Sequence, residues 1–469
     1  MRLSKIVSFS VVTLLITVVF AGATTVPAAA QYDTMQYRNN AQHSGDYSPV
    51  AGNNMSIGKL TWNYTTADIV FSSPAVSNGV VYVGSYDSNV YALNATTGAT
   101  VWNYTTGGPV LSSPAVVNEM VYLGSDDNNV YALNATTGAK VWNYTTFGMV
   151  DSSPAVANGF VYVGSDDNSV YALNATNGTF VWSFTTGGGV ESSPAVVNGT
   201  VYVGSDDNNV YALNGTTGAK LWNYTTGGGV ESSPAVVNGT VYVGSGDEYG
   251  VLRGNVYAIY ANNGTKLWSY TTGSAVLSSP AVANGTVYVG SEDDNVYALN
   301  AATGATVWNY TTGSSVYSSP AVANGTVYVG SEDNNVYALN ATTGATVWNY
   351  TTGSSVYSSP AVANGTVYVG SDDNNVYALN GTTGTKLWNY TTGGGVDSSP
   401  AVVNGTVYVG SYDNNVYAIG NATAATSQAA TSQAATSQAT TPGFDVVLVF
   451  VGFIFVGLVI AAYVVRKRS

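Results

Sequence analysis

The sequence has no cysteine and a single histidine among its 469 residues. Without cysteine the chain cannot form disulfide bonds, thiolate metal sites or a thiol nucleophile, and one histidine is too few for a zinc site or a Ser/His relay. Charge is also scarce: 8% of the residues are charged, with 12 basic against 26 acidic and a net charge of −14. This balance excludes nucleic-acid binding, which requires a basic surface. No catalytic constellation is visible, so no catalytic residue is predicted.

The abundant residues are those of a large folded β protein. The chain contains 53 glycines and 36 tyrosines, and 45% of it is hydrophobic. A disordered chain has few aromatic residues and cannot bury this much apolar surface. We therefore expect a substantial core.

The two ends carry signals for export and anchoring. Residues 1–30 are typical of a secretory signal peptide, with Arg2 and Lys5 before an apolar stretch and small residues before Gln31. Residues 31–61 form a lead-in segment. At the other end, residues 446–465 lack charge and are long enough for a transmembrane helix, and basic residues follow them directly. The pattern predicts an exported chain with a C-terminal anchor and a cytoplasmic tail.

Two further features lie beside the anchor. Residues 422–441 repeat Ala, Thr, Ser and Gln, which predicts a polar stalk and not a packed domain. Pro442, Gly443 and Phe444, followed by the apolar run and the basic tail, resemble the C-terminal sorting signal of archaeal surface proteins. That resemblance implies that residues 442–469 are cut and replaced by a lipid; the alternative is a retained transmembrane helix. Either places the protein on the outer face of the cell membrane.

All nine tryptophans belong to one internal repeat. They recur every 40 residues, with a single interval of 46, at Trp62, Trp102, Trp142, Trp182, Trp222, Trp268, Trp308, Trp348 and Trp388. Each repeat contains four short segments rich in Val, Tyr and Trp, separated by Gly, Asn, Asp and Thr, which is the pattern of β-strands joined by turns. Four strands per repeat favour an all-β propeller over a solenoid. We predict nine blades over residues 62–421, with eight blades as the alternative.

The order of the segments indicates how the ring closes. A tryptophan strand precedes the first Ser-Ser-Pro segment, whereas the last repeat ends without one. The first strand is therefore free to complete the last blade, which would remove exposed sheet edges.

Residues 92–102 (Ala-Leu-Asn-Ala-Thr-Thr-Gly-Ala-Thr-Val-Trp) resemble the tryptophan-docking motif of the pyrroloquinoline-quinone repeat propellers. The later repeats match in the same way, although Asn stands where that family often has Asp. The resemblance implies that each indole lies on the glycine of a neighbouring blade. Asn would keep the turn-capping acceptor and remove a charge.

Enzymes of that family bind an acidic, planar quinone, often beside a divalent cation and a pair of cysteines. This chain has no cysteine, and four of its lysines stand two residues before a tryptophan, distributed around the repeats. No binding site for an anionic cofactor is evident, and no quinone is predicted.

The acidic turns carry oxygen ligands suited to calcium but lack EF-hand spacing, so ordinary hairpin turns are favoured. Examples are residues 126–129, 206–209, 292–295 and 372–375.

One position varies while its surroundings repeat. The residue before each Ser-Ser-Pro segment is in turn Phe71, Leu111, Asp151, Glu191, Glu231, Leu277, Tyr317, Tyr357 and Asp397. We expect these residues to line one mouth of the central channel as a binding surface, acidic on one arc and aromatic on the other. Neutral variation at exposed positions is the alternative.

Two lesser features complete the sequence. Residues 246–254 form the one lengthened loop of the repeats. Asn-X-Thr sequons are candidate glycan sites in an exported chain, and they include Asn63, Asn94, Asn103, Asn198, Asn238, Asn324 and Asn404.

The sequence thus predicts a cell-surface, non-catalytic propeller that binds an envelope protein or a polysaccharide. A quinone- or metal-dependent surface oxidoreductase and a polysaccharide-binding lectin are the alternatives.

Overall fold

The computed structural model describes residues 34–35, 58–246 and 253–420, and every regular element in them is a β-strand. The predicted signal peptide (1–30), stalk (422–441) and sorting signal with its anchor (442–469) lie outside these residues. No helix long and apolar enough to span a membrane occurs in the described part of the chain. The chain divides into two units, Met1–Ala422 and Thr423–Ser469, and all the strands belong to the first.

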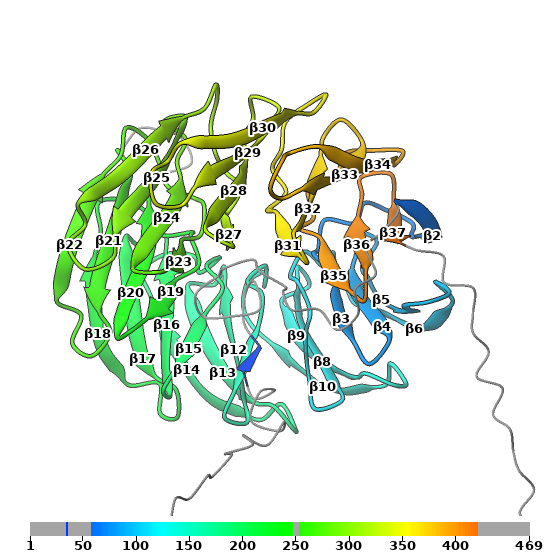
Figure 1. The fold of residues 1–469 in the computed structure, drawn as a ribbon. Helices are drawn as coiled ribbons and strands as arrows, with labels where there is room; N and C mark the ends of the chain where they lie inside the picture. Colours follow the sequence, from blue (N-terminus) through cyan, green and yellow to red (C-terminus); the bar gives the residue numbers. More distant parts are fainter. Residues whose placement is uncertain (1–33, 36–57, 247–252, 421–469) are drawn as a thin grey trace, which may run out of the picture. The chain divides into compact units, whose positions relative to one another are not determined.

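The strands form nine antiparallel sheets, each with four strands of the repeat (Figure 1). The prediction of nine blades is confirmed, and the alternative of eight is wrong. The strands of the ring run from Lys59 to Gly420, within a few residues of the predicted limits.

The first five blades, numbered in chain order, follow the repeat directly. Blade 1 contains β3 (Ala75–Ser77), β4 (Val80–Gly84), β5 (Asn89–Asn94) and β6 (Thr100–Thr105). Blade 2 contains β7 (Ala115–Val117), β8 (Met120–Ser125), β9 (Asn129–Asn134) and β10 (Lys140–Thr145). Blade 3 contains β11 (Ala155–Ala157), β12 (Phe160–Ser165), β13 (Ser169–Asn174) and β14 (Phe180–Thr185). Blade 4 contains β15 (Ala195–Val197), β16 (Thr200–Ser205), β17 (Asn209–Asn214) and β18 (Lys220–Thr225). Blade 5 contains β19 (Ala235–Val237), β20 (Thr240–Ser245), β21 (Asn255–Tyr260) and β22 (Lys266–Thr271).

The remaining blades bring the chain back to its start. Blade 6 contains β23 (Ala281–Ala283), β24 (Thr286–Gly290), β25 (Asn295–Asn300) and β26 (Thr306–Thr311). Blade 7 contains β27 (Ala321–Ala323), β28 (Thr326–Gly330), β29 (Asn335–Asn340) and β30 (Thr346–Thr351). Blade 8 contains β31 (Ala361–Ala363), β32 (Thr366–Ser371), β33 (Asn375–Asn380) and β34 (Lys386–Thr391). Blade 9 contains β35 (Ala401–Val403), β36 (Thr406–Gly410), β37 (Asn415–Gly420) and β2 (Lys59–Thr65).

The core lies between neighbouring blades. The second and third strands of each blade are buried on both faces, as their runs of Val, Tyr, Ala and Leu predict. The outer strand buries only its tryptophan deeply and exposes the residues on either side of it. Each cluster of buried side chains combines residues of two successive blades, so no blade has a complete core of its own.

All three turns of blade 3 contain residues with positive φ: Asn158 and Gly159, Asn168, and Gly178. Between the first two strands of blade 3, Asn158 (φ 53°) and Gly159 (φ 80°) form a two-residue hairpin turn. Between the outer two strands of blade 1, Asn94 Oδ1 accepts hydrogen bonds from the N–H groups of Thr96 and Thr97 at 3.0 Å each. The predicted capping role of Asn in place of Asp is thus confirmed.

The tryptophans join successive blades. Trp62 lies against Gly98, where a Cβ would stand 2.6 Å from the indole and where φ is +70°. Only glycine meets both conditions without strain, because a side chain would collide with the ring and would disfavour the backbone conformation. The same contact recurs at every junction, ending with Trp388 on Gly58.

A backbone carbonyl of the next blade holds the indole in place, as at the junction of blades 1 and 2. The Ala135 carbonyl accepts a hydrogen bond from Trp102 Nε1 at 2.9 Å and a second from the Tyr82 hydroxyl at 3.0 Å. Tyr82 also contacts the Trp102 ring, with centroids 5.8 Å apart. Because both donors come from blade 1 and the carbonyl from blade 2, one backbone oxygen holds the junction at two points.

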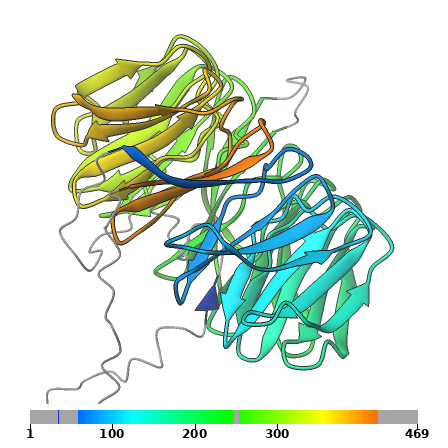
Figure 2. The same ribbon diagram turned by 90° about the vertical axis from the view of Figure 1, so that its right-hand side faces the viewer.

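Strand β2 closes the ring as the sequence predicts. It pairs antiparallel with β37, with Trp62 opposite Ala418 (Figure 2). The indole of Trp62 donates to the Ala95 carbonyl of blade 1 at 3.0 Å, and the Tyr408 hydroxyl of blade 9 donates to the same oxygen. The first and last repeats are therefore joined by the same contacts as any internal pair.

A circuit of serines runs around the channel. In each Ser-Ser-Pro segment, the N–H of the second serine donates to the hydroxyl of the matching serine in the next blade, at 3.0 to 3.3 Å. The members are Ser73, Ser113, Ser153, Ser193, Ser233, Ser279, Ser319, Ser359 and Ser399, and Ser399 donates back to Ser73. The inner strands are thus tied without a break.

One further strand lies at the inner edge of blade 3. The short β1 (Thr34–Met35) pairs antiparallel with β11, which makes this sheet five-stranded. Part of the lead-in segment therefore uses a strand edge that the propeller presents to its channel.

We expect Trp222→Ala to lower the thermal midpoint of the protein. Trp222 is 7% exposed, lies on Gly264 and donates to the Ala261 carbonyl at 2.9 Å. Truncating a buried tryptophan costs about 3–5 kcal/mol. Circular dichroism melting of the full chain measures the effect, and Lys220→Ala, at an exposed position of the same strand, should leave the midpoint within about 1 °C. Equal midpoints for Trp222→Ala and the unchanged protein would contradict this role of the indole.

Candidate functional site

The candidate site is one end of the propeller, which we call the turn face. It consists of the turns between the second and third strands of each blade and of the loops that lead from each outer strand to the next inner strand. Antiparallel pairing brings both to the same end of the blades. The two are bonded to each other: Asp126 N–H, in a turn, donates to the Pro109 carbonyl, in a loop, at 2.9 Å.

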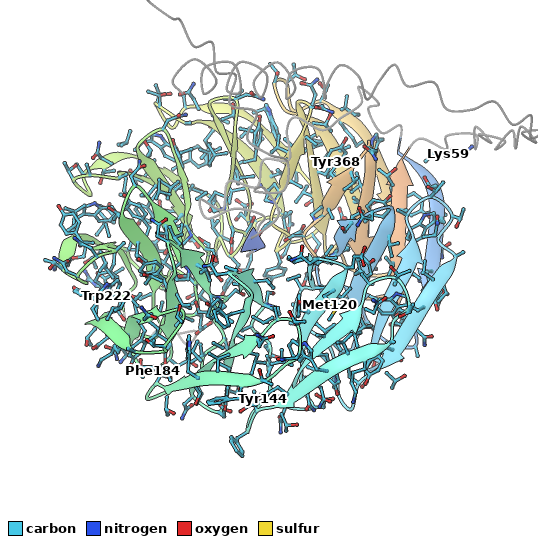
Figure 3. All side chains as sticks on the ribbon, turned by 90° about the horizontal axis from the view of Figure 1, so that it is seen from below. Lys59, Met120, Tyr144, Phe184, Trp222 and Tyr368 are labelled. Carbon is cyan, nitrogen blue, oxygen red and sulfur yellow. The ribbon has the colours of Figure 1, made fainter. Side chains whose placement is uncertain are left out.

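Acidic residues gather on this face. Every carboxylate of the described residues except Glu119 belongs to one of these turns or loops. The described cations lie elsewhere, apart from Arg253 beside the lengthened loop of blade 5. Lys59, Lys140, Lys220, Lys266 and Lys386 begin the outer strands, at the opposite end of the blades, and Figure 3 shows Lys59 at the periphery. The propeller therefore has one acidic face.

All nine residues that precede a Ser-Ser-Pro segment lie in the loops of the turn face. Phe71 and Glu191 are exposed and the other seven are partly exposed, so none is a core residue. The structure brings several of them into contact with a second set of residues that sequence reasoning did not assign to the surface. Whether the nine residues bind a partner stays a prediction.

The second set is the first residue of each turn between the second and third strands. It comprises Tyr86, Asp126, Asp166, Asp206, Gly246, Glu292, Glu332, Asp372 and Tyr412. These residues vary from repeat to repeat as the loop residues do, and that variation is the signal that could have identified them. In four places the turn residue of one blade contacts the variable residue of the next: Asp126 with Asp151, Glu332 with Tyr357, Asp372 with Asp397, and Tyr412 with Phe71.

The following residue of the turn has a structural role. Asp207 Oδ2 accepts hydrogen bonds from the Tyr211 hydroxyl and the Gly187 N–H, each at 2.6 Å, and Asp207 Oδ1 accepts two from Asn209. Burial by itself raises the pKa of Asp207, but these hydrogen bonds hold it below its ordinary value. The carboxylate thus locks a loop onto a turn, as the hairpin interpretation predicts.

Blade 5 departs from this arrangement at the lengthened loop. There the Gly227 N–H donates directly to the Tyr257 hydroxyl at 2.9 Å, without an intervening carboxylate. As for calcium, the described residues contain no group of three or more His, Cys, Asp or Glu side chains arranged to hold a metal ion.

An acidic arc extends over blades 2 to 4. Burial, a hydrogen bond to Asp126 and the charge of Asp126 raise the pKa of Asp151 to about 7. Burial and the charges of Asp151 and Asp167 also raise the pKa of Asp166. The side chains of Asp126 and Asp151 therefore form a carboxyl–carboxylate pair, in which one group stays protonated near neutral pH.

Aromatic residues lie on the other side of the ring, over blades 7 to 9 and blade 1. The rings of Phe71 and Tyr412 stack with centroids 6.2 Å apart and planes 23° apart. Tyr317 and Tyr357 contact each other at 5.9 Å. Among the nine variable loop residues, Leu111 comes between Phe71 and the acidic residues, and Leu277 comes between the acidic residues and Tyr317. Both leucines are partly exposed.

The aromatic side also contains carboxylates, so the predicted division into two arcs is incomplete. The Tyr412 hydroxyl donates to Asp397 Oδ2, and the Tyr357 hydroxyl donates to Glu332 Oε1, each at 2.6 Å. Asp372 and Asp397 form a second carboxyl pair across blades 8 and 9, and burial together with Asp397 raises the pKa of Asp372 to about 7.

The turn face does not suit an anionic quinone. Such a cofactor needs cations or clustered hydrogen-bond donors, whereas the described side chains here are mainly carboxylates that already crowd one another. The lysines of the outer strands are at the opposite end of the blades. The residues present therefore do not fit the cofactor of the quinone-dependent enzymes.

The blades, the tryptophan docking and the closing strand define a nine-bladed β-propeller of the pyrroloquinoline-quinone repeat class. A family model described as "Outer membrane protein assembly factor BamB" matches residues 50–149, 146–276 and 252–448. The chain belongs to this family.

Solved structures show the same fold at low sequence identity. BamB from Moraxella catarrhalis is 19% identical with a TM-score of 0.56, and the match covers 77% of this chain and 99% of that one. The quinohemoprotein alcohol dehydrogenase ADHIIG from Pseudomonas putida HK5 is 18% identical with a TM-score of 0.58, covering 83% and 80%. The computationally designed protein Ika8 is 16% identical with a TM-score of 0.56, covering 78% and 100%. No curated protein matches in sequence. Because the structural relatives include an assembly factor and an enzyme, the likeness shows the fold alone.

The carboxyl pairs predict an unusual pH dependence of stability. The folded chain keeps a proton on Asp151 up to about pH 7, whereas the unfolded chain releases it near pH 4. Between these values the folded state binds more protons, so the free energy of unfolding falls as the pH rises. We expect the thermal midpoint to fall from pH 5 to pH 8, and to fall less in Asp151→Asn.

Glu119→Gln provides the control, because Glu119 is an exposed carboxylate on the opposite face. This variant should show the same fall as the unchanged protein. If Asp151→Asn also followed the unchanged protein across this range, the pair would not be the source of the pH dependence.

Proposed function

We propose that the protein is a non-catalytic binding or scaffold module, held on the outer face of the cell membrane by its C-terminal segment. The main support is that two sets of residues that vary between the blades meet on the turn face, where loop and turn residues of successive blades contact each other. In a repeated scaffold, a position with a structural role requires the same residue in every blade, as at the tryptophans and serines. Variation at residues that meet on one face is what a binding surface for an asymmetric partner would require.

The proposed location is supported by patterns at the two ends of the sequence. The signal-peptide pattern of residues 1–30 supports export, and the apolar run with its basic tail supports a C-terminal anchor. The likeness of Pro442, Gly443 and Phe444 to an archaeal sorting signal supports a lipid-linked form on an archaeal-type surface. The stalk would separate the propeller from the membrane. The description of the family as an assembly factor is in keeping with a scaffold in the cell envelope.

The sequons also favour the turn face as the binding surface. Asn198, Asn238, Asn324 and Asn404 are exposed in the hairpins between the first and second strands, at the end opposite the turn face. Glycans at these positions would cover the other face and leave the turn face free.

A polysaccharide is the second candidate ligand of this surface. The rings of Phe71 and Tyr412 stack on each other, and the two residues remain 43% and 36% exposed to solvent. Exposed aromatic rings of this kind are suited to stacking on sugar rings. A glycan array probed with the full chain distinguishes a lectin from a protein scaffold.

Cross-linking on intact cells tests the proposed function. We expect the quadruple variant Glu191→Ala, Glu231→Ala, Tyr317→Ala and Tyr357→Ala to lose the envelope partners that the unchanged protein captures. A matched quadruple variant of the opposite face, Glu119→Ala, Lys140→Ala, Lys220→Ala and Lys386→Ala, should retain them. Capture that is equal in both variants, with equal amounts of folded protein on the surface, would refute a role for the turn face.

A further inference from the structure

Five residues of the turn face form a continuous surface across blades 8, 9 and 1. We call this surface the stacking arc, and its members are Phe71, Tyr357, Asp372, Asp397 and Tyr412. The two carboxyl groups contact each other, Tyr412 donates to Asp397, and Phe71 stacks on Tyr412. Tyr357 lies close enough to Asp372 for the charge of that carboxylate to act on its hydroxyl. The arc therefore combines three aromatic rings with a pair of carboxyl groups.

The carboxyl groups of the arc lack donors. Apart from their mutual contact, Asp372 Oδ1 and Asp397 Oδ1 are buried and accept no hydrogen bond from the described residues. Asp397 Oδ2 accepts a hydrogen bond from the Tyr412 hydroxyl at 2.6 Å. Two carboxyl groups in contact repel each other when both are ionised, so a bound group that brought positive charge beside the pair would be stabilised here.

The local structure holds the arc ready for a ligand. The Tyr412 ring is oriented by its hydrogen bond to Asp397, and the Tyr357 ring by its bond to Glu332. Gly395 gives both Asp372 and Tyr412 room, since a Cβ there would lie 2.9 Å from Asp372 Oδ1 and 3.1 Å from the Tyr412 ring. Side chains that are already positioned lose little entropy when a partner binds.

A guanidinium group meets both requirements of the arc. It is planar, carries five N–H donors in a fixed fork that matches carboxylates, and stacks on aromatic faces because it is weakly hydrated. An ammonium group is a compact, strongly hydrated charge and gains less from stacking. A neutral sugar would stack and donate hydrogen bonds, but it would leave the carboxylate charge uncompensated. The scarcity of cations on the described turn face leaves that charge to be compensated by a partner.

We propose that the stacking arc binds an arginine side chain of a basic segment in a partner protein, with the guanidinium on the exposed Phe71–Tyr412 stack and beside the Asp372–Asp397 pair. This rests on the proposed function and specifies the chemistry of the partner. The arc would be the anchor of the interface, because arginine and aromatic residues dominate such contacts.

The test measures binding of a fluorescent arginine-rich peptide to the full chain by anisotropy. The comparison peptides have the same length and sequence, with every arginine replaced by lysine or by citrulline, the neutral analogue of arginine. We expect the arginine peptide to bind most tightly and the lysine peptide more weakly. The dissociation constant of the citrulline peptide should be at least about tenfold higher than that of the arginine peptide. Asp397→Asn and Tyr412→Ala should each weaken arginine binding about tenfold. Tyr412→Phe, which keeps the ring, should have a smaller effect.

Glu119→Gln removes one carboxylate from the opposite face and should leave peptide binding unchanged, which separates the arc from general attraction to an acidic protein. Melting curves of each variant establish that it is folded. Binding should also weaken from pH 8 to pH 5.5, because burial and contact with Asp397 raise the pKa of Asp372 to about 7, and the proton that Asp372 takes up must be displaced by a bound cation. Asp373, Glu332, Tyr357 and Tyr412 are the other titratable groups around the pair, and both tyrosines stay protonated throughout this range since their pKa values are raised.

Two results would overturn the proposal. The first is equal affinity for the arginine and citrulline peptides. The second is binding of neutral oligosaccharides that Tyr412→Ala abolishes while the arginine peptide is not bound, which would make the arc a glycan site. In either case the cross-linking experiment still decides the proposed function separately, because it depends on capture by the whole turn face and not on the chemistry of one contact.

Discussion

An indole lying on the peptide surface of a glycine is the contact on which the propeller depends. Each such glycine has a positive φ and no space for a Cβ, and a carbonyl beside it accepts hydrogen bonds from the indole and from a tyrosine of the same blade. Because the core clusters each combine two blades, a blade becomes stable only when its neighbour is in place. The ring must therefore close, and β2 closes it with the same contacts that join the internal blades.

The closed scaffold separates structural from variable positions. The tryptophans, the Ser-Ser-Pro serines and the aspartates at the second turn position are tied to a neighbouring blade or loop, as Asp207 is tied to Gly187. In blade 5 the Tyr257 hydroxyl takes the place of this aspartate. The first turn residues bond to the loops through their backbone N–H groups, but the side chains of these residues and of the variable loop residues are not part of these ties. A rigid ring can vary these residues without loss of stability, which is the usual condition under which a scaffold acquires recognition.

The acidic turns show how one stretch of sequence contains two roles. In Asp206 and Asp207 the second carboxylate receives four hydrogen bonds, and its pKa is lowered. The first has its pKa raised by burial and by its acidic neighbours. The sequence shows two adjacent acidic residues and does not distinguish them. The folded structure does so, because it gives Asp207 four hydrogen-bond donors and places Asp206 beside the carboxylates of Asp166 and Asp207.

The sequence by itself determined the number of blades, the strands, the closing strand and the capping asparagines, since these depend on local spacing and turn chemistry that repeat nine times. It also predicted which loop residues vary. Only the tertiary structure decided which residues those loops meet: Asp126 with Asp151, and Tyr412 with Phe71, are separated by 25 and by 341 positions. Such contacts arise from the packing of one blade on the next and from closure of the ring, and neither is encoded within a single repeat.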